Sequence, residues 1–279
     1  MLIWQEREYK GVDLATLVHP PSIHALKACG LYKFWAIPSM RAQVDFLQWL
    51  VDRWNIQDQC FIIDGHQLEI ELEDIYFLIG FPKRGERLSL FRTRPGGQSI
   101  DSLQLEFCND QTKDKGIDIK TISHPELKVI SFIVTKLCGS TTLHVATRSK
   151  IQMAAECYRG TIFNWCEAVL ANVKSELNRA RNEQLKNFRY GFLVVSFGLE
   201  RVPMLVPQQL SVGVGLPREP KLVRWVTVMA RHPQEGSEVV RFALEYFCWL
   251  ENQLFVIQDF FYTGMDYHGD PDMILPPRE

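Results

Sequence analysis

The sequence predicts a mainly α, multi-helix globular domain with one small antiparallel β-hairpin near residues 60 to 71. Three observations support this prediction. Apolar residues recur at helical spacing over several long segments, and one short segment alternates apolar with charged residues as a half-buried strand does. In addition, 46% of the 279 residues are hydrophobic, which is enough to bury a sizeable core.

The first expected helix covers residues 39–55. One side of it carries a stripe of apolar residues, Met40, Val44, Leu47, Val51 and Trp54. A polar stripe follows the opposite side, so the helix is expected to pack against another element. We expect burial of Trp54 and Leu47 to fix the helix on the neighbouring hairpin, each side chain contributing about 1.5–3 kcal/mol.

The hairpin follows at once. Phe61 to Ile63 is a β-branched and aromatic run, Asp64-Gly65 favours a tight turn, and Leu68 to Glu71 alternates apolar with charged residues. A helical pattern then begins at Leu72 and ends before Gly80 and Pro82, two residues that terminate helices.

Residues 83–122 lose the helical periodicity and are expected to form one long loop. Four helices are expected after it, the first capped by Ser123 with Pro125 in its first turn. Its inner face is expected to carry Leu127, Ile130, Val134 and Leu137. The others cover residues 147–158, 162–181 and 187–202, and the last is apolar all round, as expected of a central buried helix.

Prolines and glycines after residue 202 predict a linker, followed by two helices at 221–231 and 236–262. The sequence therefore divides into a helical core, residues 1–205, and a linker with a C-terminal helical extension, residues 206–279. The apolar stripe of the last helix suits either packing on the same core or docking of another chain.

Charge and cysteine usage limit the classes of function. A net charge of −2 argues against a globally basic nucleic-acid binder but leaves local basic patches open. The seven cysteines show no C-x-x-C spacing, so reduced thiols are expected. Neither a secretory signal nor an apolar run of about 20 residues is present. We therefore expect a soluble, intracellular protein that does not associate with membranes.

The segment from residue 60 to 85 resembles the plant mobile domain, also called the aminotransferase-like plant mobile domain. The family pattern is a Trp-containing helix, a hairpin and then T-x-T-L-x-D-V-x-x-L-x-G-L-P-x-x-G. The residues that carry the resemblance are Trp54, Leu72, Asp74, Leu78, Gly80, Pro82 and Gly85. Glu69 and Glu71 depart from it, since the family commonly has Thr there. The resemblance covers roughly residues 25 to 205.

This resemblance implies a non-enzymatic nuclear interaction module, similar to the maintenance-of-meristems proteins. Such proteins are associated with silencing of mobile DNA, genome maintenance, meristem maintenance and a phosphatase-like protein partner. Other members of the family are accessory segments of transposable elements. The word aminotransferase implies no cofactor here, because no lysine can be singled out as a Schiff-base residue.

A group of carboxylates is the best catalytic candidate: Glu69, Glu71, Glu73 and Asp74. Neighbouring carboxylates can hold a divalent metal for phosphoryl chemistry, as a transposon nuclease requires. The favoured interpretation is structural, with the first two on the solvent face of a strand and the others near a helix N-terminus, at about 0.3–1 kcal/mol each. No metal or catalytic residue is therefore assigned, and a metal-dependent nucleic-acid-processing enzyme of transposon origin is the alternative function.

One basic run is the best candidate for nucleic-acid contact: Lys83, Arg84, Arg87, Arg92 and Arg94. Five basic residues with one acidic residue, Glu86, give a local charge of +4. If all five neutralised phosphates, the affinity for DNA would fall with salt at a logarithmic slope of about −4.5. The alternative, a solvated loop, is favoured because ordering such a segment costs conformational entropy.

Overall fold

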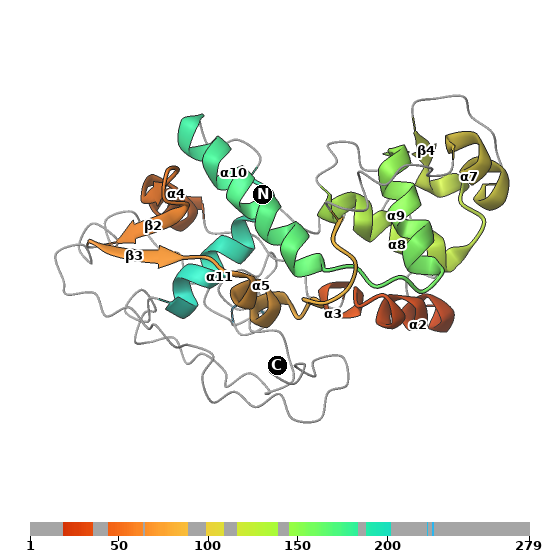
Figure 1. Ribbon diagram of the computed structural model, residues 1–279, viewed down its shortest axis with the longest axis horizontal. Coiled ribbons are helices and arrows are strands. Elements are labelled where there is room, and N and C mark those ends of the chain that lie inside the picture. The colour runs from red at the N-terminus through yellow and green to blue at the C-terminus, as the bar shows by residue number, and fades with distance from the viewer. Residues whose placement is uncertain are drawn as a thin grey trace, which may run out of the picture. The chain divides into compact units, whose positions relative to one another are not determined.

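The computed structural model describes residues 19–35, 44–63, 65–88, 99–108, 116–138, 145–183 and 188–201, together with Leu222 and Trp225. Within these residues the protein is mainly helical, with nine α-helices, a three-stranded antiparallel sheet and a separate two-stranded pairing (Figure 1). The predicted fold class is confirmed. None of the helices in this part of the chain combines the length and apolarity needed to cross a bilayer.

The contacts divide the described residues into two units, the first formed by 44–80 and 170–201 with Leu222 and Trp225, the second by 19–35 and 81–169. This division differs from the predicted boundary near residue 205. That boundary and nearly all of the extension lie outside the described residues, so the predicted domain arrangement stays a prediction.

The first unit is built from α4 (Val44–Asp52), β1 (Trp54–Asn55), β2 (Cys60–Ile63), β3 (His66–Glu69), α5 (Leu72–Ile79), the later part of α10 (Trp165–Asn182) and α11 (Gly191–Arg201). All eleven residues of α11 are buried, as its mostly apolar sequence predicts. It approaches α4 closely: a Cβ added to Gly198 would lie 3.0 Å from Leu50 Cδ1 and from Phe46 Cζ. The absence of a side chain at Gly198 thus allows the two helices to pack.

The sheet has the order β1-β2-β3, and its register separates two faces. Trp54 pairs with Phe61, which pairs with Leu68, so these three side chains share the buried face. The Trp54 and Phe61 rings meet edge to face with centroids 4.9 Å apart. Ile62 pairs with Gln67 on the opposite face, where both are exposed.

The hairpin prediction is confirmed, although its strands differ slightly in length. Ile63 pairs with His66 across two residues, the second of which is Gly65 with φ +76°. Asp64 lies outside the described residues. The prediction of a helix over residues 39–55 is wrong at its C-terminal end, since α4 ends at Asp52 and Trp54 lies in β1. The chain leaves the helix there because it pairs with β2, and the Ile62 N–H donates a 2.8 Å hydrogen bond to the Arg53 carbonyl.

The helix predicted from Leu72 is confirmed at both ends. The side chain of Asp74 accepts a 2.7 Å hydrogen bond from the backbone N–H of Glu71, which satisfies a donor left free at the start of α5. Gly80 adopts the left-handed conformation with φ +70° and returns its N–H to the Tyr76 carbonyl.

The second unit contains α2 (Pro20–Ala28), α3 (Tyr32–Trp35), α7 (Ile100–Phe107), β4 (Ile117–Asp118), the 3-10 helix η2 (Ile119–Thr121), α8 (Pro125–Leu137), β5 (Val145–Ala146), α9 (Arg148–Tyr158) and the first turn of α10. Helix α8 lies side by side with α9 and also packs against α2 (Figure 1). The four apolar residues predicted on its inner face are all buried.

The prediction of one long loop over residues 83–122 is wrong. This segment contains α7, η2 and a strand, β4, which pairs with β5. A short helix or strand with few buried residues shows no clear apolar period in its sequence. In α7, for example, the apolar residue Leu105 is 70% exposed. The hydroxyl of Ser99 accepts a hydrogen bond from the Ser102 N–H and starts α7.

Two helix starts also differ from prediction. Ser123 does not cap α8, since its hydroxyl donates to the Phe107 carbonyl and His124 occupies the N-cap position. Helix α10 begins at Trp165 rather than Ile162, because the side chain of Asn164 accepts a hydrogen bond from the Glu167 N–H and caps the helix there.

Candidate binding site on the small sheet

The loop between β1 and β2 is fixed by its own side chains. Asn55 Oδ1 accepts hydrogen bonds from the backbone N–H groups of Gln57, 2.9 Å, and Asp58, 3.2 Å, and its Nδ2 donates to Asp58 Oδ2. An asparagine that closes a turn in this way replaces the hydrogen bonds of a backbone turn. The loop therefore has a definite shape without belonging to a regular element.

A second set of hydrogen bonds attaches the loop to α10. Asn178 Oδ1 accepts from Trp54 Nε1, 2.8 Å, and from Gln59 Nε2, 2.9 Å. Gln59 Nε2 also donates to the Ile56 carbonyl at 2.6 Å. Gln59 has φ +54°, and among the described residues it is the one non-glycine with positive φ. This uncommon conformation is therefore held in place by the neighbouring structure.

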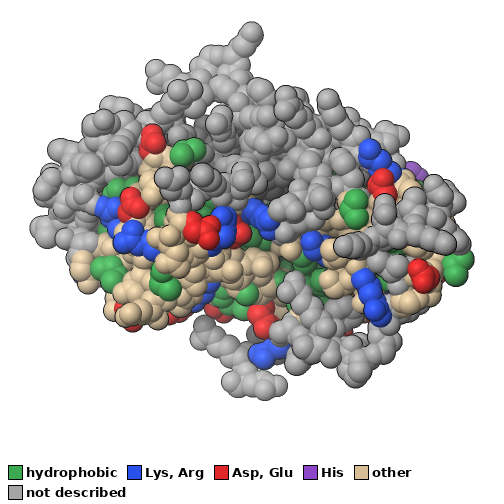
Figure 2. All heavy atoms as spheres, turned by 90° about the horizontal axis from the view of Figure 1, so that it is seen from above, with side chains coloured by type: hydrophobic (Ala, Val, Ile, Leu, Met, Phe, Trp, Pro, Cys, Tyr) green, Lys and Arg blue, Asp and Glu red, His purple; other side chains and the backbone are tan. Residues whose placement is uncertain are grey.

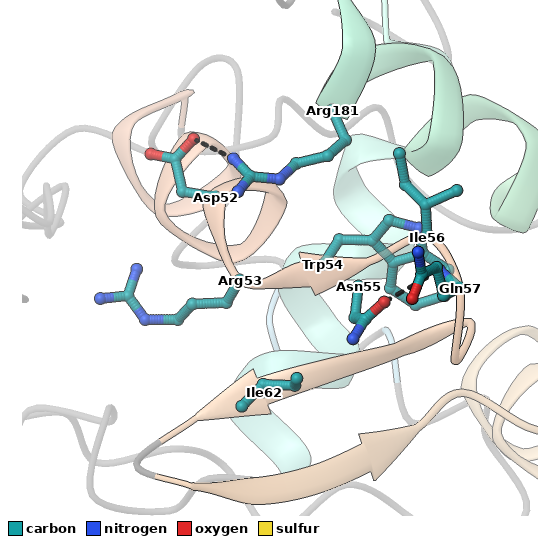
Figure 3. A pocket seen from close by; sticks show the side chains of 8 residues that line it. All are labelled: Asp52, Arg53, Trp54, Asn55, Ile56, Gln57, Ile62 and Arg181. Atoms are coloured by element: carbon teal, nitrogen blue, oxygen red, sulfur yellow. Dashed lines mark hydrogen bonds and ion pairs between the residues drawn. The ribbon is translucent and has the colours of Figure 1, made fainter.

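An open pocket of about 440 Å³ lies beside this loop, lined by residues 52–57, Ile62 and Arg181, and is called the sheet pocket below (Figure 3). It draws on the end of α4, on β1, on the loop, on the solvent face of β2 and on the end of α10. Its volume falls in the range of ligand sites. Every lining residue belongs to the first unit.

Two guanidinium groups and one carboxylate set the charge of the sheet pocket. Arg53 lies over the Trp49 ring, with Cζ 3.9 Å from the centroid, and its Nη1 donates to the Trp49 carbonyl at 2.8 Å. Arg181 Nη1 is 3.8 Å from Asp52 Oδ1, which also accepts from Gln48 Nε2 (Figure 3). Two positive charges and one negative charge leave the pocket with a formal charge of +1.

The lining suits binding better than reaction. It offers guanidinium and amide donors, amide and carboxylate acceptors, and the aliphatic side chains of Ile56 and Ile62. The lining residues that the structure describes include no thiol, hydroxyl or imidazole group. Its one carboxylate, Asp52, already faces Gln48 and Arg181. The arrangement can orient an anionic or amphipathic ligand.

The carboxylates that the sequence singles out have different environments. Asp74 is 1% exposed and lies 3.3 Å from Arg201 Nε, in an ionic contact rather than an aligned hydrogen bond. Glu69, Glu71 and Glu73 are exposed. In the part of the chain that the structure describes, no three His, Cys, Asp or Glu side chains are grouped to hold a metal ion.

The basic run is described only in part. Arg84 and Arg87 are exposed, and Arg87 Nε lies 3.6 Å from Glu167 Oε2. Lys83 is half-buried, while Arg92 and Arg94 lie outside the described residues. On the face shown in Figure 2, described basic and acidic side chains lie beside one another. Contact between this run and nucleic acid stays a prediction.

The residues that carry the family resemblance have structural positions. Trp54, Leu78 and Asp74 are buried in the first unit. Leu72 is half-buried at the start of α5 and Gly80 ends that helix. In the second unit, Pro82 lies against Gly30, and Gly85 lies against the backbone of Ile162. Burial accounts for the apolar side chains of Trp54 and Leu78, the start of α5 for Asp74, and the close backbone approach for Gly85. These positions show a structural role for each residue.

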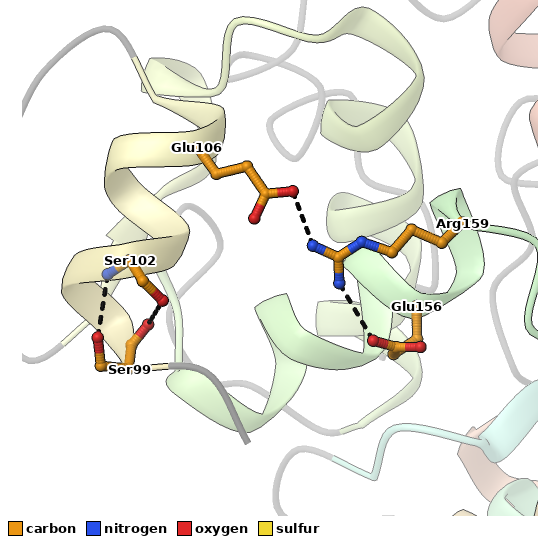
Figure 4. Close-up of polar contacts among 5 residues, drawn as sticks. All are labelled: Ser99, Ser102, Glu106, Glu156 and Arg159. Carbon is orange, nitrogen blue, oxygen red and sulfur yellow. Dashed lines mark hydrogen bonds and ion pairs between the residues drawn. The ribbon is translucent and has the colours of Figure 1, made fainter. Parts of the chain in front are cut away.

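The second unit carries a charged cluster of its own, between α7 and α9 (Figure 4). Arg159 bridges Glu106, 2.7 Å, and Glu156, 3.1 Å. All three side chains are at least one third exposed, so solvent screens these pairs and their contribution to stability is small. With one arginine and two glutamates, this cluster has a formal charge of −1, opposite in sign to that of the sheet pocket.

Sequence patterns do not reveal the sheet pocket. Asn178 and Gln59 are 119 residues apart, and Arg181 falls among several charged residues of α10 that look alike in the sequence. The one local signal is Asn55 followed by Asp58, since Asn and Asp commonly stabilise turns. That signal predicts a turn, but it does not predict that the turn lines a pocket.

The fold and the site define a mainly helical protein whose small antiparallel sheet presents an open pocket. The chain belongs to the family described as a domain of unknown function (DUF8566), whose model matches residues 12–195. No curated protein and no solved structure matches the chain.

Proposed function

We propose that this protein is a non-enzymatic interaction module of the nucleus. It acts in silencing of mobile DNA, in genome maintenance or in meristem maintenance, or serves as the accessory segment of a transposable element. The resemblance to the plant mobile domain supports this biological setting. The binding-type lining of the sheet pocket supports interaction rather than reaction.

One observation favours an interaction module over the alternative, a metal-dependent nucleic-acid-processing enzyme. Asp74, the buried member of the acidic set, caps α5 through the Glu71 N–H and faces Arg201 at 3.3 Å. A carboxylate used in this way is acting as a structural group, and Arg201 competes with any cation for it. The remaining carboxylates of the set are exposed to solvent.

The proposal is tested by affinity purification from plant nuclear extract on the immobilised full chain. We expect a partner retained in stoichiometric amount and identified by mass spectrometry, and the family resemblance implies a phosphatase-like protein. In parallel, the chain is incubated with plasmid and single-stranded DNA in Mg²⁺ or Mn²⁺. Cleavage that disappears in Glu71→Gln and Glu73→Gln variants would support the enzyme and overturn the proposal.

Nucleic-acid contact through the basic run is measured separately. Affinity for labelled duplex DNA is determined over a range of NaCl concentrations, and a logarithmic slope near −4.5 would indicate that all five basic residues neutralise phosphates. The variant Arg84→Gln should then lower the slope by about 1, whereas Lys128→Gln, on α8, should not change it. Absent or salt-independent binding removes this function from the proposal.

A further inference from the structure

We infer that the sheet pocket binds an extended acidic peptide of a partner protein, in which a carboxylate side chain neighbours an aliphatic one. This inference rests on the proposed interaction function and names the partner's chemistry.

Charge complementarity is the first argument. Arg53 and Arg181 come from different elements, one beside β1 and one at the end of α10. Among the described lining residues, Asp52 is the one side chain of opposite charge. Two contacts with Trp49 hold the Arg53 guanidinium in place, one over the indole ring and one to the backbone carbonyl. A fixed guanidinium is well suited to a carboxylate, because its parallel N–H groups match the two carboxylate oxygens.

The apolar part of the pocket is the second argument. Ile62 is 39% exposed on the solvent face of the central strand, and Ile56 lies on the loop at the same pocket. An exposed aliphatic side chain beside arginines complements a ligand that places an aliphatic group next to its carboxylate. Such groups occur together along an acidic peptide.

The rigidity of the loop is the third argument. Asn55 and Asn178 hold the loop through hydrogen bonds to other groups of the chain itself. Binding to a preformed site loses less conformational entropy than binding to a site that must become ordered. The site is therefore ready to recognise a partner segment.

Two other occupants fit less well. The pocket is open to solvent, whereas small-molecule sites enclose most of the ligand surface. Single-stranded nucleic acid needs exposed aromatic platforms, but Trp49 and Trp54 are each only 2% exposed and the pocket contains a carboxylate. A peptide requires neither an enclosed cavity nor a stacking surface.

The experiment is a selection from a library of random nonapeptides displayed on phage, with the full chain as bait. We expect the enriched peptides to combine Asp or Glu with a neighbouring aliphatic residue. A synthetic peptide of the most enriched sequence is then titrated by fluorescence anisotropy. Its affinity should fall as NaCl is raised, because the attraction to the arginines is screened.

Variants place the interaction on the pocket. Ile62→Asp should weaken the selected peptide by about tenfold or more, since it removes an apolar contact and adds a like charge. Arg181→Gln should weaken it by about two- to fivefold. The matched controls are Leu105→Asp, an exposed apolar residue of the second unit, and Arg179→Gln, which changes the same charge on the same helix. Neither control should change the affinity by more than about twofold.

The outcomes separate this inference from the proposed function. If no peptide is enriched, if the enriched peptides lack acidic residues, or if Ile62→Asp binds as the unchanged chain does, the inference is overturned. An oligonucleotide that binds at Ile62 and Arg181 in place of a peptide also overturns it. If the nuclear partner still binds the Ile62→Asp chain, the proposed function stands and only its location at this pocket fails.

Discussion

The indole N–H of Trp54 donates a 2.8 Å hydrogen bond to the side-chain oxygen of Asn178, 124 residues further along the chain. The same oxygen accepts a hydrogen bond from Gln59. A single amide on α10 thus positions both the buried anchor of β1 and the loop that follows it. The sheet pocket depends on this connection, because its lining residues 54–57 lie between the two donors.

Replacement of Asn178 by alanine should destabilise the first unit by about 2 kcal/mol, because the Trp54 and Gln59 donors lose their shared acceptor. Urea unfolding followed by tryptophan fluorescence measures this loss. Asn178→Asp keeps an acceptor oxygen and should cost less. Asn182→Ala, at the exposed end of the same helix, should stay within about 0.5 kcal/mol of the unchanged chain. Equal losses in Asn178→Ala and Asn182→Ala would contradict the anchoring role.

The buried ion pair between Asp74 and Arg201 should be costly to break from one side. Arg201→Met leaves a buried carboxylate without its opposite charge and should cost about 3–5 kcal/mol in the free energy of unfolding. The double variant Asp74→Asn with Arg201→Met should recover part of that loss, since neither charge remains. As a control, Asp52→Asn breaks a half-exposed pair and should cost under about 1 kcal/mol. If the double variant were the least stable of the set, the charge argument would fail.

The hairpin and α5 were predictable because each signal lies within a few residues of the next. Turn residues, strand alternation and a glycine C-cap depend on local backbone preferences, and the structure has all three where the sequence indicates them. Helix α8 was predictable because its apolar residues sustain a helical period over more than three turns. Helix α11 was predictable as a long, mostly apolar segment, the pattern of a buried helix.

The elements that escaped prediction are those fixed by distant partners. Strand β1 has two residues and exists because β2 pairs with it, while β4 needs β5, about 28 residues away along the chain. Helix α7 buries few side chains and is therefore poorly marked by periodicity. The sheet pocket is the extreme case, since its geometry depends on contacts between residues 52–62 and the end of α10.

Gly85 should tolerate substitution far less well than Gly65, although both have positive φ. A Cβ at Gly85 would lie 2.3 Å from the Ile162 carbonyl oxygen, which accepts a 2.9 Å hydrogen bond from the Glu86 N–H. Gly85→Ala must displace this backbone and should cost more than about 3 kcal/mol. Gly65→Ala meets nothing within 4 Å and should cost about 1 kcal/mol, from its left-handed conformation alone. Thermal unfolding of the two variants compares them, and similar losses would contradict the steric argument.

The thiol of Cys60 should make the protein less stable as the pH rises through the alkaline range. Burial raises the pKa of this thiol above its ordinary value of 9.0, and the negative charges of Asp58 and Glu69 raise it further, against an opposing effect of Lys174. The folded chain therefore keeps the Cys60 proton at a pH where the unfolded chain releases it. The contribution of the protonated thiol to the free energy of unfolding is complete below pH 9.0 and is lost as the pH rises through the pKa of the folded state.

This predicts that the free energy of unfolding of the unchanged chain falls more steeply between about pH 8 and pH 10 than that of Cys60→Ala.

In the folded protein, alkylation of Cys60 by iodoacetamide should be slow and should become faster in Glu69→Gln, because removal of a nearby negative charge favours the reactive thiolate. Glu73→Gln, which removes a charge of the same sign from exposed α5 surface, serves as the control. A Cys60 alkylation rate that responds equally to both changes would show that the charge of Glu69 does not act on this thiol.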